Sequence, residues 1–187
     1  MAIFITTATV QSAQPATNAP SVDLVFREPF TLTLQVDKEH RYEARFDRKI
    51  PYVADNDVYL FSGESFGLTL SITNGEIAKL SYQKEKNGAD IELEFKQELQ
   101  TGKDPMMLLI LKSNIKHTLY LDAMMTRPEK DGVYNTSILP LQPGLSGYES
   151  WPHPIVQLVL TNLRLKKTAP NKGLQDIGAK ARLQPEP

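Results

Sequence analysis

Residues 90–96, Asp-Ile-Glu-Leu-Glu-Phe-Lys, alternate charged and apolar side chains without a break. Successive side chains of a β-strand point to opposite faces, so this alternation predicts a strand with one dry face and one wet face. The same period of two recurs over residues 30–36 and 41–46. Residues 106–111 are apolar throughout, which favours a strand covered on both faces.

Turn sequences beside this strand predict its pairing partners. Asn87-Gly88 suits a two-residue primed turn, in which both residues take positive φ. That loop sets Tyr82 opposite Leu93 and Leu80 opposite Phe95, so apolar side chains meet in register.

A second hairpin is predicted around Asn74-Gly75. A two-residue loop would set Leu70 opposite a lysine. We therefore expect a three-residue loop, residues 73–75, which sets Leu70 opposite Ala78 instead. Together the two hairpins predict a three-stranded antiparallel meander over residues 66–97.

The chain as a whole is predicted to be all-β, a single antiparallel β-sandwich of immunoglobulin-like or jelly-roll-like type. Roughly nine or ten strand segments follow at intervals of about 8–12 residues, and no segment has a convincing helical period. We expect the sandwich to span residues 23–166. Residues 1–22 are interpreted as a signal-peptide remnant or a disordered segment, and residues 167–187 as a flexible tail.

Composition narrows the function classes. The 187 residues include 21 Lys and Arg against 22 Asp and Glu, a net charge of -1, so the electrostatic footprint of a nucleic-acid binder is missing. The absence of cysteine excludes disulfides, thiolate metal sites and cysteine catalysis. We expect no metal and no other cofactor, and we leave the partner open between a glycan and an envelope protein.

The amino terminus indicates export. Residues 2–10 are apolar with small side chains, and a small-residue zone follows up to Ala16, as at the end of a signal peptide. No Lys or Arg follows Met1, so the pattern is incomplete, and a disordered tail or a first edge strand is the alternative. No segment reaches the ~20 apolar residues that span a bilayer. We therefore expect a soluble periplasmic or secreted protein that does not span the membrane.

A pentapeptide, Gly63-Glu-Ser-Phe-Gly67, matches the G-x-S-x-G pattern of serine hydrolases. Those enzymes place the serine on a strand–turn–helix elbow, but the residues after Ser65 alternate as a strand. Asp122 and His153 follow Ser65 in the order Ser, Asp, His of a catalytic triad, but this order is also common by chance. The turn-and-strand interpretation is therefore preferred, and hydrolysis through Ser65 is kept as an alternative.

Other polar residues suggest chemistry that simpler explanations also cover. Residues 55–57, Asp-Asn-Asp, resemble calcium ligands but also suit a turn before the next strand. Glu92 and Glu94 could form a glycosidase carboxylate pair, although charged residues are expected on the wet face of a strand. His117 alternates with apolar neighbours, so we expect a hydrogen-bonded core histidine and not a metal ligand.

The most informative stretch is residues 148–154, Tyr-Glu-Ser-Trp-Pro-His-Pro, within a long connection over residues 139–153. We assign ligand binding to Tyr148, Glu149, Trp151 and His153, because aromatic faces beside polar groups suit a sugar or a peptide. The alternative is that Trp151 plugs one end of the sandwich.

Three functions follow from these patterns. The first is an exported, non-enzymatic binding or structural domain of the bacterial cell envelope that uses the 139–153 loop. The second is a carbohydrate-binding module or carbohydrate-active enzyme with Tyr148 and Trp151 as its platform. The third is a serine hydrolase.

Overall fold

The computed structural model describes residues 24–99, 104–128 and 130–166. Within these residues the chain forms fourteen β-strands and no helix, which confirms the predicted all-β class. Three of the strands have only two residues, and this accounts for part of the excess over the nine or ten expected. The strands are β1 (Phe26–Arg27), β2 (Phe30–Gln35), β3 (Arg41–Phe46), β4 (Ile50–Pro51), β5 (Val53–Ala54), β6 (Asp57–Leu60), β7 (Glu64–Thr73), β8 (Glu76–Gln83), β9 (Ile91–Glu98), β10 (Met106–Ser113), β11 (Leu119–Arg127), β12 (Lys130–Thr136), β13 (Ser146–Trp151) and β14 (Gln157–Leu165).

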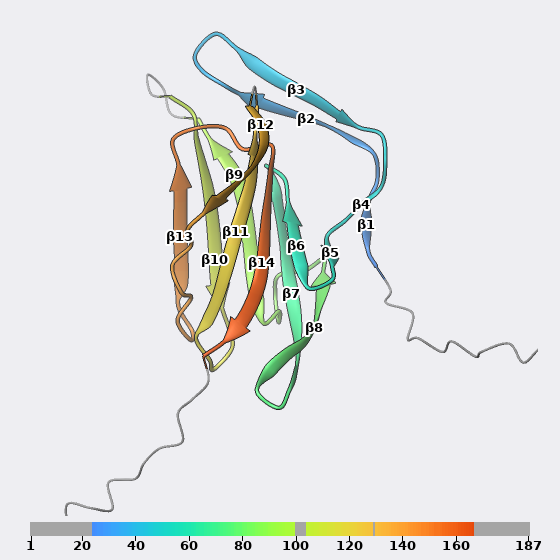
Figure 1. Cartoon of the computed structure of the whole chain (residues 1–187), viewed down its shortest axis with the longest axis vertical. Coiled ribbons are helices and arrows are strands. Elements are labelled where there is room, and N and C mark those ends of the chain that lie inside the picture. Colours follow the sequence, from blue (N-terminus) through green and yellow to red (C-terminus); the bar gives the residue numbers. More distant parts are fainter. Residues whose placement is uncertain (1–23, 100–103, 129, 167–187) are drawn as a thin grey trace, which may run out of the picture.

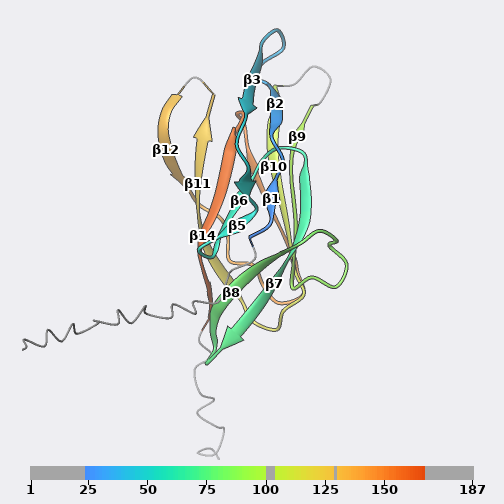
Figure 2. The ribbon, with the colours of Figure 1, turned by 90° about the vertical axis from the view of Figure 1, so that its right-hand side faces the viewer.

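Two five-stranded antiparallel sheets pack face to face as a β-sandwich (Figures 1 and 2). The first sheet has the order β13-β10-β9-β7-β8, and the second has the order β12-β11-β14-β6-β5. Leu93 and Phe95 of the first sheet and Leu158 and Leu160 of the second are all buried in one core. The described residues include no helix long and apolar enough to cross a membrane.

An extra hairpin, β2–β3, packs beside the upper end of the sandwich in both views (Figures 1 and 2). Its side chains alternate as predicted, because Leu32 and Leu34 are buried while Thr31 and Thr33 are exposed. Two hydrogen bonds to the Gln97 side-chain amide hold the hairpin to β9. The Gln35 N–H donates to Gln97 Oε1 (2.9 Å), and Gln97 Nε2 donates to the Gln35 carbonyl (2.8 Å).

The predicted meander is wrong, because β7 lies between β8 and β9 and pairs with both. The hairpin from β7 to β8 exists, but its loop is the two-residue turn Asn74-Gly75, with φ of 53° and 77°. Ala78 is an extra, bulged residue of β8, and it shifts the register so that Leu70 faces Leu80. A bulge therefore solves the mismatch that the longer loop was expected to solve.

Asn87-Gly88 does not form the predicted hairpin turn. The Ala89 N–H bonds to the Lys86 carbonyl (3.0 Å), and of the two central residues only Gly88 has positive φ. The chain instead crosses from β8 over β7 to reach β9. Asp90 anchors that crossing, because its N–H donates to the Leu68 carbonyl (2.9 Å).

The apolar run of β10 is buried on one face only. Met107, Leu109 and Leu111 face the core, whereas Met106, Leu108 and Ile110 are half-buried on the outer face. The expectation of a strand covered on both faces is therefore met for alternate residues only.

Candidate functional site

The stretch selected from the sequence is an edge strand, β13, and not a continuous loop. Among the described strands β13 pairs with β10 alone, with Tyr148 opposite Ile110 and Trp151 opposite Met107. Alternate residues of β13 therefore face opposite sides of the sheet. The long connection expected over 139–153 thus contains six residues of regular strand.

Trp151 points into the sandwich and is only 7% exposed. Its indole Nε1 donates to Thr136 Oγ1 of β12 (2.8 Å), and its ring meets Phe95 edge-on with centroids 6.5 Å apart. Because β12 and β13 belong to different sheets, this hydrogen bond links the two layers. The geometry matches the plug that was considered as the alternative to ligand binding.

Tyr148 lies on the other face of β13 and is 66% exposed. Tyr148 and Trp151 therefore do not form one aromatic platform. Glu149 is half-buried, and its Oε1 accepts a hydrogen bond from the Leu139 N–H (2.8 Å), which ties the incoming loop to the strand.

His153 is half-buried just after β13. Burial lowers the pKa of its imidazole, and the positive charge of Arg127 adds to that effect. Its Nδ1 lies 3.4 Å from the Pro154 carbonyl. The imidazole is thus favoured in its neutral form.

Ser65 lies within β7, opposite Glu94, and its neighbours continue as a strand. No elbow surrounds it. Asp122 is on the exposed face of β11 in the other sheet, where it accepts hydrogen bonds from Asn162 (2.6 Å) and Arg164 (3.3 Å). Both Ser65 and Asp122 face away from the shared core, so they lie on opposite outer faces of the sandwich and are not assembled into a triad.

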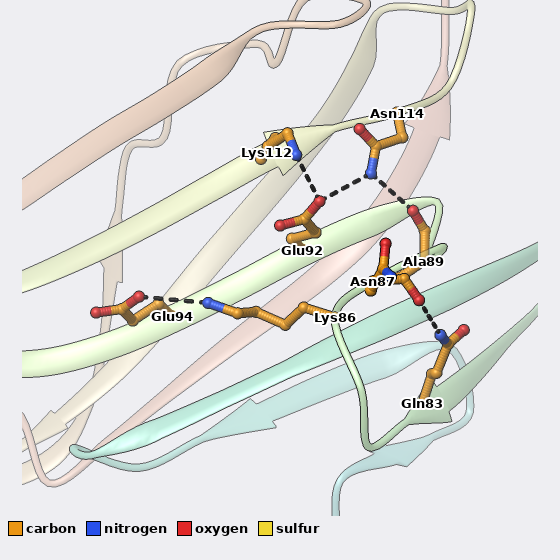
Figure 3. Close-up of polar contacts among 8 residues, drawn as sticks. All are labelled: Gln83, Lys86, Asn87, Ala89, Glu92, Glu94, Lys112 and Asn114. Carbon is orange, nitrogen blue, oxygen red and sulfur yellow. Dashed lines mark hydrogen bonds and ion pairs between the residues drawn. The ribbon is translucent and has the colours of Figure 1, made fainter.

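The carboxylates of β9 are engaged with cations on the outer face of the first sheet (Figure 3). Glu92 pairs with Lys112 (2.7 Å) and accepts from Asn114 (3.1 Å), and the side-chain bond from Lys112 is the main cause of its lowered pKa. Glu94 pairs with Lys96 (3.1 Å), which likewise lowers its pKa. A glycosidase needs one carboxyl group with a raised pKa as its general acid, and neither of these two has one.

The same outer face holds the chain crossing in place. Asn114 Nδ2 donates to the Ala89 carbonyl (2.8 Å), and Lys86, in the loop between β8 and β9, reaches Glu94 of β9 (3.5 Å; Figure 3). This polar network therefore has a structural role, which explains why charged and amide side chains gather on this face.

No group of three or more metal-ligating side chains occurs among the described residues. His117 is exposed in the turn between β10 and β11, so the expectation of a core histidine is wrong. Asp55 and Asn56 form the two-residue turn between β5 and β6, with φ of 53° and 63°. This is the turn role that competed with calcium binding. Asn56 Oδ1 also accepts a hydrogen bond from the Leu80 N–H of β8 (2.8 Å), 24 residues along the chain.

Arg27 and Glu64 form a buried ion pair that no sequence pattern indicated. Arg27 is only 5% exposed, and its guanidinium binds both carboxylate oxygens of Glu64 and donates to the Pro51 carbonyl (2.6 Å). The guanidinium carbon lies 3.8 Å from the centroid of the Tyr52 ring. The sequence around Arg27 does not indicate that the arginine is buried and paired, because its partners Pro51 and Glu64 are 24 and 37 residues away.

Comparisons with protein-family models, with curated proteins and with solved structures gave no match.

Proposed function

We propose that this chain is a non-enzymatic binding or structural domain that contacts a protein partner along the β12–β13 side of the sandwich. The observation that carries the proposal is the distribution of exposed apolar side chains. Of the ten large hydrophobic residues exposed in the described part of the chain, five lie between residues 133 and 148. They are Val133, Tyr134, Leu139, Leu145 and Tyr148.

The strands of this region favour contact with another chain. β12 and β13 are the edge strands of their sheets on the same side, and each has only one described neighbour. Six of the seven residues of β12 are exposed, on both of its faces. Exposed apolar groups beside open strand edges are typical of interaction surfaces.

The buried residues beside this surface supply a rigid support. Trp151 and Glu149 hold β13 to β12 and to the preceding loop through their hydrogen bonds. A surface held in one conformation loses less entropy when it binds. Export to the bacterial cell envelope stays a prediction, because residues 1–22 lie outside the described residues.

A photocrosslinking residue at position 148, in cells that make the protein naturally, tests the proposal. We expect covalent adducts with one defined protein from position 148 and from position 139. The matched control is position 71 of β7, which is also exposed but lies in another region. Equal labelling from all three positions, or from none, would contradict the proposal.

Two further assays separate the alternatives. Saturable quenching of tyrosine fluorescence by a glycan, lost in Tyr148→Ser, would favour a carbohydrate-binding module. Covalent labelling of Ser65 by a fluorophosphonate would favour a hydrolase. Either result would replace the proposed function.

A further inference from the structure

β13 forms the outer edge of the first sheet, and this edge presents backbone groups that have no strand to pair with (Figure 1). The register of β13 on β10 places Leu145 opposite Ser113, and the Ser113 N–H donates to the Leu145 carbonyl (2.9 Å). Opposite residues of antiparallel strands alternate between pairs that exchange hydrogen bonds and pairs that exchange none. Counted from this bond, the backbone groups of Ser146, Tyr148 and Ser150 point away from β10. No other described backbone group bonds to them.

β13 lacks the features that usually protect an open strand edge, which are charged side chains, proline and bulges. Its six residues include no lysine, arginine or proline, and it pairs with β10 without a register shift. Its one charged residue, Glu149, lies on the core-facing side and binds the Leu139 N–H. Other edges are protected: β12 pairs through a register shift, and β3 carries exposed charged side chains. The edge of β13 is therefore open to pairing with another strand.

We propose that the partner on this side is a second copy of the same chain, and that the two β13 strands pair antiparallel about a two-fold axis at Tyr148. This inference rests on the proposed function, because it names the partner of the same surface. One register uses all three residues with outward backbone groups. It sets Tyr148 opposite the partner's Tyr148 and Ser146 opposite the partner's Ser150. The two first sheets of five strands would then form one continuous sheet.

The side chains of β13 are complementary to themselves in this register. Opposite residues of paired strands lie on the same face, so the two tyrosine rings meet on the outer face with small serines beside them. On the core-facing side, Glu149 lies opposite the partner's Gly147, which has neither a side chain nor a charge. No like charges are opposed along the strand. A surface that matches itself in this way suits a two-fold dimer, the commonest form of soluble oligomer.

Exposed apolar side chains beside β13 provide contact area that a strand pair alone lacks. Tyr148 lies next to Ile110 on the outer face, opposite it in the register with β10. Leu145 directly precedes the strand and is 58% exposed, and Leu139, tied to Glu149, is 75% exposed. Pairing of the two edges brings these side chains to the contact, where their removal from water favours association.

Cysteine variants test the pairing, since the chain has no cysteine of its own. In the proposed register the Cα atoms of the two residues 148 are about 5.5 Å apart, within the range of a disulfide. Under mild oxidation we expect Tyr148→Cys to give a covalent dimer. The double variant Ser146→Cys/Ser150→Cys should give one as well, and it keeps the tyrosine.

Two single variants serve as controls. Ser146→Cys alone should stay monomeric, because its counterpart in the other copy is four residues away along the paired strands. Ser71→Cys, exposed on β7, should also stay monomeric. No dimer from either Tyr148→Cys or the double variant would overturn the inference. So would a dimer from Ser146→Cys alone, which indicates another register, or equal dimer formation by Ser71→Cys, which indicates random collision.

A proline at position 150 tests the hydrogen bonds without a crosslink. The Ser150 N–H points away from β10, so Ser150→Pro removes a bond of the dimer and none of the β13–β10 ladder. Light scattering should give twice the mass of one chain for the parent protein and for Ser150→Ala, which keeps the N–H. Ser150→Pro, with an unchanged circular dichroism spectrum, should give the mass of one chain at the same concentration. A parent protein that is monomeric at every concentration, or a proline variant as dimeric as the parent, would contradict the pairing.

Photocrosslinking from position 148 distinguishes failure of this inference from failure of the proposed function. We expect an adduct of twice the chain mass that yields peptides of this chain only. An adduct with a different protein would overturn the second copy as partner and leave the proposed function in place. No adduct from position 148 or position 139 would overturn both.

Discussion

Gly67 lies directly beneath Ala89, so close that a side chain at position 67 would collide with it. A Cβ built on Gly67 would approach the Ala89 Cβ to less than 3.0 Å, a separation that Cβ atoms essentially never show. The backbone carbonyl of Glu85 would also be only 3.1 Å away. This contact lets the chain cross from β8 over β7 to β9, so a missing side chain helps to determine the strand order.

The first prediction concerns this crossing. Gly67→Ala should lower the free energy of unfolding by about 1–3 kcal/mol, because backbone atoms must shift to admit the methyl group. Urea unfolding measures the change. Gly147→Ala in β13 is the control, since its nearest atom is the flexible end of Leu141 at 3.3 Å, and its effect should be smaller. Equal losses for the two variants would mean that the crossing is not tightly packed over β7.

The second prediction concerns the core face of β9. Leu93→Ala should cost ~2–5 kcal/mol of stability, because it leaves a cavity at a fully buried position. Glu94→Ala on the outer face removes half-exposed ion pairs and should cost less than about 1 kcal/mol. Denaturant unfolding of both variants measures the contrast. A reversed order would show that the faces of β9 are assigned the wrong way round.

The third prediction concerns the buried ion pair. Arg27→Met should destabilise the fold by about 3–5 kcal/mol, since it leaves the carboxylate of Glu64 without its main partner. The double variant Arg27→Met/Glu64→Gln should recover part of that loss, because no unpaired charge remains. A double-mutant cycle by thermal or denaturant unfolding measures the coupling. Strictly additive losses would show that the two side chains act independently.

The fourth prediction concerns the pH dependence of stability. Burial lowers the pKa of His153 in the folded protein below the 6.5 of an exposed histidine. At a pH between the pKa of His153 in the folded protein and 6.5, the unfolded chain binds more protons at this residue than the folded protein does. The contribution of His153 to stability is therefore complete above pH 6.5 and falls as the pH decreases below it. The carboxylates with lowered pKa values lose their contribution only at more acidic pH.

Unfolding curves at pH 7.5 and 5.5 measure this dependence. His153→Gln should reduce the loss of stability between the two values, because glutamine does not titrate. An NMR titration of the His153 ring should give a pKa below 6.5. A ring pKa above 6.5 would contradict the prediction, because His153 would then make the folded protein more stable as the pH decreases.

Alternation along the chain was enough to predict several of the strands and which of their faces is buried, as in β2 and β9. Leu93 and Phe95 are buried as their period predicts, and Glu92 and Glu94 are on the outer face. This works because side-chain direction in a strand depends only on its backbone, which makes the pattern local. The all-β class follows from the same observation.

Strand pairing depended on contacts between distant residues. Asp90 bonds to Leu68 and, through its carboxylate, to the Leu70 N–H (2.7 Å), and so brings β9 against β7. A local turn signal at Asn87-Gly88 cannot reveal that competing partner. The bulge at Ala78 similarly changes a register that turn length alone would set differently.

For the candidate site, the sequence located an aromatic and polar stretch, and its three-dimensional surroundings separated its members. Trp151 is buried because Thr136 and Phe95, from two different sheets, meet it between the layers. Tyr148 is exposed because it lies on the opposite face of the same strand. Local pattern thus defines which side chains share a face, whereas only the packing of one sheet on the other decides which face becomes the interior.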